Sequence, residues 1–204
     1  MDGAALVKAV QAKLDVTADG KIGPETLLAV YKEILGKNPA KSMTAGKADP
    51  RSEETMAKLQ PELLPYGRML VARAASIGIE IKLISGYRSY AEQDALFAIG
   101  RTTQLNRGHV TDAKGGESNH NFGIAFDVGV FEGKTYIPND PAPYDAVGAI
   151  GTEIGLEWGG NWKSFNDKPH YQLRPAWASL MSEREMLAEL RERVKAGVSP
   201  YAEG

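Results

Sequence analysis

Apolar side chains recur at helical spacing along much of the chain. Near the N-terminus Leu6, Val10 and Leu14 share one face, and residues 27–34 repeat the pattern after a turn that contains glycine and proline. A helical stretch, interrupted or prefaced by Pro61 and Pro65, is predicted at residues 52–77, and further helices at residues 89–99, 143–155 and 182–196. A serine followed three residues later by a glutamate opens the second and the last of these, which is the pattern of a capping box.

Other segments have the pattern or the composition of strands. Residues 79–85 alternate apolar and charged side chains, although Ile84 breaks the alternation. Residues 123–130 have the composition of a buried strand. A further predicted strand places His170 and Gln172 on one face. Helices and strands are therefore mixed in the larger part of the chain.

Two stretches without periodicity organise the chain. Residues 37–50 collect Pro, Gly, Lys and Ser and are predicted to be a linker. Residues 100–122 are rich in Gly, Asn, Thr and charge, and loops of this length in compact domains are often functional. We expect three parts: a helical segment at residues 1–40, a main domain at 41–180, and a C-terminal helix with its tail at 181–204.

Composition limits the classes of partner. Hydrophobic residues make up 43% and charged residues 25% of the 204 positions, which is ordinary for a soluble globular protein. A net charge of −2 gives no basic footprint for nucleic acid, and no apolar run approaches the roughly 20 residues of a membrane span. We expect neither nucleic-acid binding nor membrane insertion. Because the chain has no cysteine, a transition metal would have to be bound through imidazole and carboxylate groups.

The chain has three histidines, and two of them stand close to an aspartate. His120 and Asp127 share the segment SNHNFGIAFD, and Asp167 and His170 share DKPH. The proline favours extended backbone before it, so the second pair is not a helical neighbour pair. A histidine, an aspartate and a histidine make a three-ligand set of the kind that catalytic zinc uses. Hydrogen-bonded histidine–aspartate pairs without a metal are the alternative, and we interpret His109 as an ordinary loop residue.

Three short motifs follow one another along the chain: SGYRS at residues 85–89, SxHxxGxAxD at residues 118–127 and DKPHYQ at residues 167–172. Together they resemble the motifs of the M15-type zinc D,D-peptidases. The segment VTDAKGG at residues 110–116 resembles the endopeptidase branch, and the resemblance covers residues 42–175. The family comprises vancomycin-resistance carboxypeptidases and dipeptidases, together with L-alanyl-D-glutamate endopeptidases of bacteriophages and Bacillus.

The resemblance implies a fold and one bound zinc ion. The expected fold is α+β, with an antiparallel sheet and flanking helices on the D,D-peptidase and hedgehog-like scaffold, preceded by a small helical segment. By the same resemblance the zinc ligands are His120, Asp127 and His170. Asp167 is then the general base, and Arg88 stabilises the oxyanion.

The resemblance also suggests contacts around this site. Ser118 is expected to orient the site through a hydrogen bond, and Gln93 to touch the substrate, with a solvated helix position as its alternative. The aromatic residues Tyr87, Trp158 and Trp162 are candidates for the walls of the substrate cleft, and packing in the core is their alternative.

The residue at position 167 helps to choose the substrate. The carboxypeptidase and dipeptidase branches usually have glutamate there, whereas this chain has Asp167, as the L-alanyl-D-glutamate endopeptidases do. An aspartate is one methylene shorter, so its backbone must stand closer to the metal. This predicts cleavage of the L-Ala–D-Glu bond in the peptidoglycan stem peptide. The alternatives are a D-alanyl-D-alanine carboxypeptidase and, from another class, a non-catalytic binding module with structural zinc, as in the hedgehog domains.

The N-terminal segment points to the same polymer. Residues 7–30 resemble part of a peptidoglycan-binding repeat, so peptidoglycan is the expected partner, and simple packing against the peptidase domain is the alternative. We expect a monomer that acts on the bacterial cell wall, on its periplasmic or extracellular side. The N-terminus has charges where a signal peptide needs its apolar region. That is consistent with an endolysin released through a phage-induced membrane lesion, or with a chain trimmed of its leader.

Overall fold

In the computed structural model of the protein the chain divides into two compact units, Met1–Ala45 and Gly46–Gly204. The residues that the structure describes are 2–20, 26, 30, 33, 47–138, 140–163 and 165–202. The predicted boundary between residues 40 and 41 lies outside them. So do most of the predicted helix at residues 27–34 and most of the predicted linker at residues 37–50.

The first unit contains helix α1 (Gly3–Lys13). Asp2 caps its start, since the carboxylate accepts a hydrogen bond from the first turn of the helix at 2.7 Å. Gln11 is buried and fixes the turn that follows the helix. Its amide donates to Asp19 Oδ1 at 2.7 Å, and its carbonyl oxygen accepts from Gly20 N at 2.8 Å. A turn is therefore present at the start of the segment where the sequence predicts one.

The second unit is built on an antiparallel sheet. Its strands are β1 (Glu80–Ser85), β2 (Ala125–Glu132), β3 (Thr135–Tyr136), β4 (Glu157–Trp158) and β5 (His170–Gln172). They are ordered β1-β2-β5-β4, with β3 paired to β2, and each pairing is antiparallel. The predicted α+β class with an antiparallel sheet is therefore confirmed. The strands β3 and β4 have two residues each and are too short to leave a periodic pattern in the sequence.

Helices and short 3-10 turns surround this sheet. The helices are α4 (Pro50–Met56), α5 (Leu64–Ser76), α6 (Tyr90–Ala98), α7 (Pro141–Glu153) and α8 (Glu183–Lys195), and the 3-10 turns are η1 (Pro61–Leu63), η2 (Asn119–Phe122), η3 (Gly159–Asn161) and η4 (Ala176–Ala178). The stretch predicted at residues 52–77 is divided before Pro61, because proline lacks the N–H that a helix interior needs. Both predicted capping boxes are present, at Ser89 and at Ser182.

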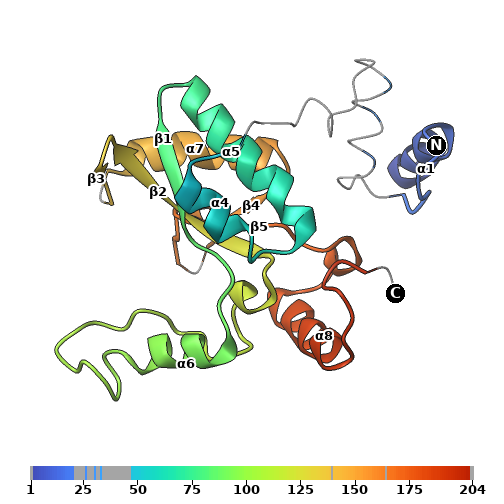
Figure 1. Ribbon diagram of the computed structural model, residues 1–204. Helices are drawn as coiled ribbons and strands as arrows, with labels where there is room; N and C mark the ends of the chain where they lie inside the picture. The colour runs from blue at the N-terminus through green and yellow to red at the C-terminus, as the bar shows by residue number, and fades with distance from the viewer. Residues whose placement is uncertain are drawn as a thin grey trace. The chain divides into compact units, whose positions relative to one another are not determined.

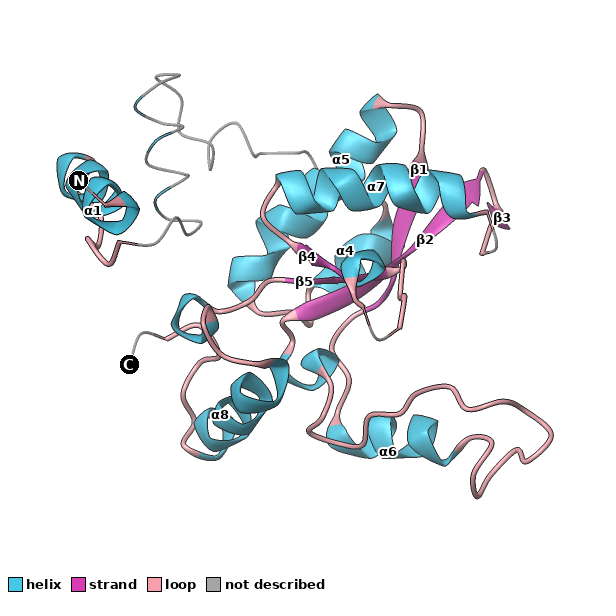
Figure 2. Ribbon diagram, turned by 180° about the vertical axis from the view of Figure 1, so that it is seen from behind, coloured by secondary structure: helices cyan, strands magenta, loops and turns pink. Residues whose placement is uncertain are grey.

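The apolar core lies between one face of the sheet and the helices α5 and α7. Figures 1 and 2 show these helices on one side of the sheet, whereas α6 with its long loop and α8 lie on the other side. Phe126 of β2 and Tyr171 of β5 belong to the buried cluster, as do apolar residues of both covering helices. Because side chains alternate along a strand, the neighbours Asp127 and His170 point to the opposite face. The fold thus separates a packed face from a polar one.

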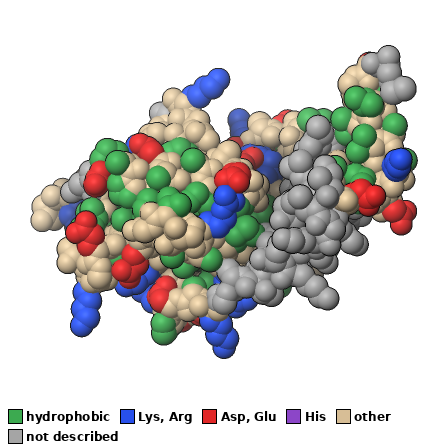
Figure 3. Space-filling view, turned by 90° about the horizontal axis from the view of Figure 1, so that it is seen from above, with side chains coloured by type: hydrophobic (Ala, Val, Ile, Leu, Met, Phe, Trp, Pro, Cys, Tyr) green, Lys and Arg blue, Asp and Glu red, His purple; other side chains and the backbone are tan. Residues whose placement is uncertain are grey.

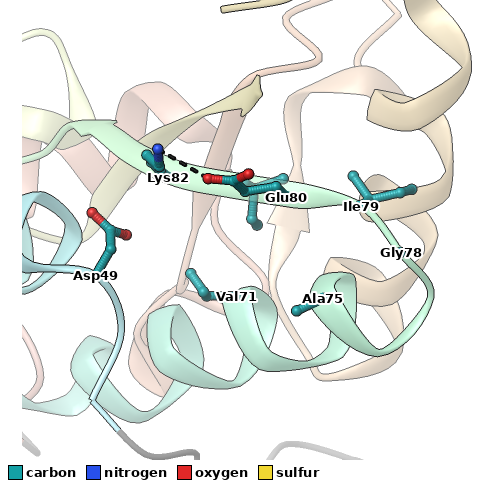
Figure 4. A pocket seen from close by; sticks show the side chains of 8 residues that line it. Asp49, Val71, Ala75, Gly78, Ile79, Glu80 and Lys82 are labelled. Carbon is teal, nitrogen blue, oxygen red and sulfur yellow. Dashed lines mark ion pairs between the residues drawn. The ribbon is translucent and has the colours of Figure 1, made fainter. Parts of the chain in front are cut away.

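Helix α4 covers part of the outer edge of β1. Ser52 Oγ accepts a hydrogen bond from Leu83 N at 2.9 Å, so this edge group has a partner. Beside it, a pocket of about 320 Å³ lies between α5 and β1 (Figure 4). Its charged side chains are already engaged, since Glu80 and Lys82 pair at 2.9 Å and Asp49 caps α4. The pocket therefore offers no free charge for chemistry.

No helix in the described part of the chain is both long and apolar enough to cross a bilayer. The described part of the face seen in Figure 3 carries acidic and basic side chains interspersed with hydrophobic ones, without a continuous basic patch. This face is in keeping with the small net charge of −2.

Candidate metal centre

Three side chains from separate elements meet on the polar face of the sheet. His120 comes from η2, Asp127 from β2 and His170 from β5. Asp127 and His170 are paired directly across the two strands, so their side chains emerge side by side. His120 Nε2 and His170 Nδ1 each lie 3.3 Å from Asp127 Oδ1, and the two nitrogens lie 3.3 Å apart. The structure therefore brings together the three residues that the sequence singles out.

A left-handed glycine lets His120 reach this position. The turn η2 ends at Gly123, whose φ of +69° lies in the region that favours glycine, and the chain then enters β2. The segment after β1 holds η2 from the other side. Arg88 N donates to His120 O at 3.1 Å, and Asn121 Nδ2 donates to Arg88 O at 2.8 Å. These contacts fix the backbone of the histidine relative to the sheet.

Hydrogen bonds decide which nitrogen of each imidazole carries the proton. His120 Nδ1 lies 2.8 Å from Gly86 O, which can only accept, so Nδ1 donates and Nε2 keeps a lone pair. His170 Nε2 lies 3.0 Å from Gln172 Oε1, so here Nε2 donates and Nδ1 keeps the lone pair. Both lone pairs face Asp127. Such partners on the far nitrogen are usual for histidines that bind metals.

The three facing atoms fit a tetrahedral metal ion. With these tautomers neither nitrogen can donate to the other or to the carboxylate, so three lone pairs converge, which is favourable only around a cation. Ligand atoms about 2.0–2.1 Å from a tetrahedral metal are roughly 3.3–3.4 Å apart. The three atoms of this site are each separated by 3.3 Å. A divalent ion held here would keep a fourth position for a molecule in the adjoining cleft.

The electrostatics of the metal-free site show the same preference for positive charge. Burial favours the neutral carboxyl of Asp127, but the charge and hydrogen bonds of His120 and His170 outweigh it and hold the pKa of Asp127 well below its ordinary value. Burial likewise opposes a charged His170, but the hydrogen bond that the protonated imidazole donates to Asp127 outweighs that effect and raises the pKa of the histidine. The three groups thus favour positive charge between them.

Asp167 lies at the start of the turn that leads into β5. Its backbone oxygen accepts from His170 N at 3.1 Å, and its N–H donates to Gly159 O at 3.1 Å. A Cβ atom on Gly159 would lie 2.4 Å from Asp167 O, so only glycine allows this close approach. Burial raises the pKa of Asp167, the charge of Asp127 raises it further, and the two histidines partly oppose both effects. The carboxylate is therefore a stronger proton acceptor than that of an exposed aspartate.

Arg88 follows the end of β1, where the strand changes register. The pairing of β1 with β2 shifts at Ile84, which accounts for the broken alternation there, and Ser85 comes to lie opposite Asp127. Arg88 Nη2 donates to Ser85 Oγ at 3.1 Å, and Arg88 Nη1 donates to Gln93 Oε1 at 2.7 Å. The guanidinium is thus held beside the strand that carries Asp127.

Gln93 supports the guanidinium from inside the protein. It is 0% exposed, and its amide nitrogen donates to Thr111 Oγ1 at 3.3 Å and to Ala113 O at 2.8 Å. Because both N–H groups are used on the long loop, its oxygen is left to accept from Arg88. A buried side chain of this kind is available neither for the expected contact with substrate nor for the alternative of a solvated helix position.

The candidate ligands, Asp167 and Arg88 line one cleft of about 1000 Å³. Residues 109–113 of the long loop also line it, as do Trp162 and Phe165. The ring of Trp162 packs 4.9 Å from that of His170 and 5.0 Å from that of Phe165, measured between centroids. His109 thus borders the cleft, although its sequence context indicates only a loop residue.

Comparison with known proteins identifies the family of the chain. A family model described as D-alanyl-D-alanine carboxypeptidase matches residues 111–173. The chain is 37% identical over 126 residues to the peptidoglycan L-alanyl-D-glutamate endopeptidase CwlK of Bacillus subtilis, and the alignment covers 57% of this chain and 74% of that protein. The chain belongs to the M15 family of peptidases.

Solved structures similar to this M15 peptidase include two other peptidases. The L-Ala D-Glu endopeptidase ChiX of Serratia marcescens is 26% identical, with a TM-score of 0.47 over 62% of this chain and 88% of that chain. A variant of the vancomycin resistance D,D-pentapeptidase VanY in complex with Zn(II) is 16% identical, with a TM-score of 0.46 over 67% of this chain and 83% of that chain. The family assignment rests on the alignment with CwlK.

The remaining predicted site residues of this M15 peptidase, Ser118, Tyr87 and Trp158, do not all line the cleft. Ser118 lines the cleft, and the hydrogen bond that it accepts within the η2 turn uses its backbone oxygen. Tyr87 is 48% exposed and is not among the described residues that line the cleft. Trp158 packs against the core, and its indole N–H donates to Lys168 O at 2.8 Å, within the turn that carries Asp167. Trp158 therefore supports that turn from the core.

Sequence reasoning missed the residues that hold the histidines from behind. Gly86 O accepts a hydrogen bond from His120. Asn119 donates to the amide oxygen of Gln172, and Glu157 accepts from the amide nitrogen of Gln172. Gln172 left one signal in the sequence, because it shares a predicted strand face with His170. Glu157 left none, because it lies in a two-residue strand that reaches the site only through pairing with β5.

Proposed function

We propose that this M15 peptidase is a zinc-dependent endopeptidase that hydrolyses the L-Ala–D-Glu bond of peptidoglycan stem peptides at the bacterial cell wall. The observation that carries the proposal is the 3.3 Å triangle of ligand atoms from His120, Asp127 and His170. The carboxylate of Asp167 stands in the same cleft. The substrate follows from CwlK, which is 37% identical and is named a peptidoglycan L-alanyl-D-glutamate endopeptidase.

Zinc suits the donor set better than the other common divalent ions. Two imidazole nitrogens and one carboxylate oxygen are ligands that zinc accepts, whereas magnesium and calcium prefer oxygen ligands. The chain has no cysteine that could add a thiolate. Three protein ligands with a free fourth position are typical of catalytic zinc, and one ion accounts for the three residues.

Asp167 would move the protons of the reaction. Zinc bound at the site would lower the pKa of a water molecule to about 7 and polarise the scissile carbonyl. Asp167 would accept a proton from the water as it attacks, because burial keeps the pKa of this carboxyl above its ordinary value. The same group would then give the proton to the leaving amine of D-Glu, so the aspartate ends each cycle ionised as it began.

Arg88 would stabilise the negative charge that develops on the carbonyl oxygen. Its guanidinium lines the cleft, and its hydrogen bonds to Ser85 and Gln93 hold it before substrate arrives. A fixed cation favours the transition state over the ground state, because the neutral amide does not yet carry this charge. Removal of one such group typically costs about 3 kcal/mol of transition-state stabilisation, or a factor of roughly 100 in kcat.

The alternative within the family is release of a terminal D-Ala. The family model that matches residues 111–173 is described as D-alanyl-D-alanine carboxypeptidase. Both reactions use the same chemistry, so the bond that is cut depends on what the cleft binds on either side of it. Asp167 favours the endopeptidase, because the carboxypeptidase and dipeptidase branches usually have glutamate at this position.

Mass spectrometry of digested peptidoglycan tests the proposal. Purified wall is incubated with the zinc-loaded wild type and with Asp167→Ala, and new amino termini are labelled. We expect fragments that begin with D-Glu from the wild type, formed at least about 100-fold more slowly by the variant. Free D-Ala without D-Glu termini would move the protein to the carboxypeptidase branch. No product from the wild type would favour a binding module with structural zinc.

We also propose that the first unit retains the enzyme on its polymer. Residues 7–30 resemble part of a peptidoglycan-binding repeat, and Gln11 organises the start of the turn that carries the resemblance. Sedimentation with insoluble peptidoglycan compares the full chain with a variant that lacks residues 1–40. Weaker retention of the shortened chain is expected, and equal retention would overturn this role.

A further inference from the structure

We propose that Glu157 is a positioning residue that sets the tautomer of His170 through Gln172, and that helix α8 takes part in this support. The proposal rests on the metal centre proposed above. It adds that Glu157 keeps the lone pair of His170 Nδ1 directed towards the metal position. Five hydrogen-bonded side chains behind His170 carry the argument, and we call them the outer ring: Gln172, Glu157, Arg174, Glu183 and Asn119.

The outer ring is a closed circuit of hydrogen bonds and ion pairs. Gln172 Nε2 donates to Glu157 Oε2 at 2.6 Å. Glu157 also accepts from Arg174 Nε at 2.5 Å, and Arg174 Nη2 donates to Glu183 Oε2 at 2.7 Å. Asn119 Nδ2 donates both to Glu183 and, at 2.6 Å, to Gln172 Oε1. The last contact closes the circuit at the residue where it begins.

The circuit leaves Gln172 only one orientation. Its amide has a donating and an accepting end, and its partners decide which way it points. The Glu157 carboxylate only accepts, so Nε2 faces it, while Asn119 presents an N–H to the oxygen. The same oxygen lies 3.0 Å from His170 Nε2, which must therefore donate. A neutral imidazole has one N–H, so His170 Nδ1 keeps its lone pair towards Asp127.

Burial keeps water away from the two amides and the imidazole at the centre of the circuit. Gln172 is 1% exposed, and Asn119 and His170 are each 5% exposed. Asn119 Oδ1 has no hydrogen-bond partner within the described part of the chain, so the two bonds that Asn119 donates are what orient it. If Gln172 were reversed, its N–H groups would face those of Asn119, and the Glu157 carboxylate would face an oxygen. The tautomer of His170 is thus built into the fold.

Helix α8 contributes through its first residue. Glu183 follows Ser182, whose capping box fixes the start of the helix. Arg174 joins Glu183 to Glu157, and both Arg174 and Glu183 line the cleft. These two residues lie beyond residues 111–173, which the family model matches. The C-terminal helix, which the sequence predicts as a separate part, therefore belongs to the support of the metal centre.

Glu157→Gln tests the proposal with a nearly isosteric change. Arg174 retains the remaining oxygen, so the new amide nitrogen faces Gln172, which turns over and presents its own N–H groups to His170. His170 then carries its proton on Nδ1, the atom that faces the metal. Nitrogen NMR of the metal-free protein at alkaline pH is expected to show this proton on Nδ1 in the variant and on Nε2 in the wild type. The zinc dissociation constant, measured by competition with a chelator, is expected to rise about 10- to 100-fold.

A second exchange separates control of the tautomer from a general loss of structure. When Glu157→Gln is combined with Gln172→Glu, the carboxylate at position 172 accepts from His170 whichever way it turns. We expect this double variant to recover the Nε2 tautomer and most of the zinc affinity. Glu153→Gln is the matched control, because Glu153 is 64% exposed and pairs with Arg73 on the surface, and it is expected to change neither property.

The outcomes separate this assignment from the proposed function. A proton that stays on Nε2 in Glu157→Gln would overturn it. So would a loss of affinity that the double variant fails to recover, because Glu157 would then only support the fold. The NMR readout needs neither zinc nor substrate. A wild type that binds no zinc, with the tautomer change still present in the variant, would sink the proposed function and leave the role of Glu157 standing.

Discussion

At the scale of single residues, hydrogen-bond partners fix the tautomers of the two candidate histidine ligands and the position of Arg88. Gly86 O fixes the proton of His120, and Gln172 Oε1 fixes that of His170. The oxygen of Gln93 accepts from Arg88 because its nitrogen is occupied by the long loop. Gln93 therefore holds the guanidinium of Arg88 at the cleft, although Gln93 itself is buried.

Gln93→Met keeps the approximate volume of the side chain and removes its hydrogen bonds. Arg88 loses an acceptor at 2.7 Å, and Ala113 O loses a donor at 2.8 Å. Because the guanidinium is then less well placed, kcat is expected to fall by up to about 100-fold with little change in KM. Initial rates on a soluble stem-peptide substrate measure both constants.

Gln93→Glu is the matched control for this prediction. Its carboxylate still accepts from Arg88 but donates nothing to Thr111 or Ala113. We expect a higher kcat than in Gln93→Met, while both variants lose about 1–3 kcal/mol in the free energy of unfolding from buried groups left without partners. If both variants raised KM and left kcat unchanged, Gln93 would bind substrate and its positioning role would be wrong.

At the scale of helices and strands, the sequence was informative where a pattern is long or a cap is explicit. The capping boxes at Ser89 and Ser182 mark the starts of α6 and α8, and the alternation in β1 is present up to Ile84. The helical stretch predicted at residues 52–77 consists of three elements, and its division before Pro61 agrees with the interruption expected at the prolines. Local patterns therefore predict most elements of the second unit.

The support of the candidate site is where sequence patterns stop being informative. His120, Asp127 and His170 belong to recognisable motifs, but Glu157 reaches Gln172 only because β4 pairs with β5. Gly86 reaches His120 only because the segment after β1 crosses η2. Such contacts depend on the arrangement of several elements in space, and no spacing along the chain encodes them.

Helices α4 and α5 are joined by a two-fold ion pair whose strength depends on pH. Arg68 Nε and Nη2 donate to the two oxygens of Glu53 at 3.0 and 2.7 Å. The hydrogen bond from Arg68 lowers the pKa of Glu53 below its ordinary value of 4.5, although burial opposes it. A carboxyl group whose pKa is lowered by folding stabilises the protein above its ordinary pKa. That stabilisation is lost as the pH falls through the lowered value.

Glu53→Gln is expected to lower the free energy of unfolding by about 1 kcal/mol at neutral pH, since the pair is only partly buried. The difference from the wild type should shrink as the pH falls through the lowered pKa of Glu53, because the wild type then loses its ion pair as well. Urea unfolding at neutral and acidic pH measures this difference in the free energy of unfolding. Glu54→Gln is the control, because Glu54 is exposed. A difference that does not change with pH would contradict the ion-pair account.

At the scale of the whole molecule, the metal centre joins parts of the chain that lie far apart in sequence. Its candidate ligands come from η2, β2 and β5, and its outer ring adds β4 and α8. The unfolded chain cannot hold His120, Asp127 and His170 together without the cost of closing the loop between them. Zinc should therefore bind the folded state far better than the unfolded one, which couples metal binding to the stability of the second unit.

Removal of zinc is accordingly expected to lower the Tm of the protein. A ligand that binds only the folded state adds about 4 kcal/mol at a thousandfold excess over its dissociation constant, which shifts Tm by several degrees. Calorimetry of the zinc-loaded protein with and without a chelator measures the shift. Asp127→Asn should remove most of it, because a neutral amide replaces the one anionic ligand of the triangle. An equal shift in both proteins would place the zinc at another site, and no shift in either would mean that the triangle does not hold the metal tightly.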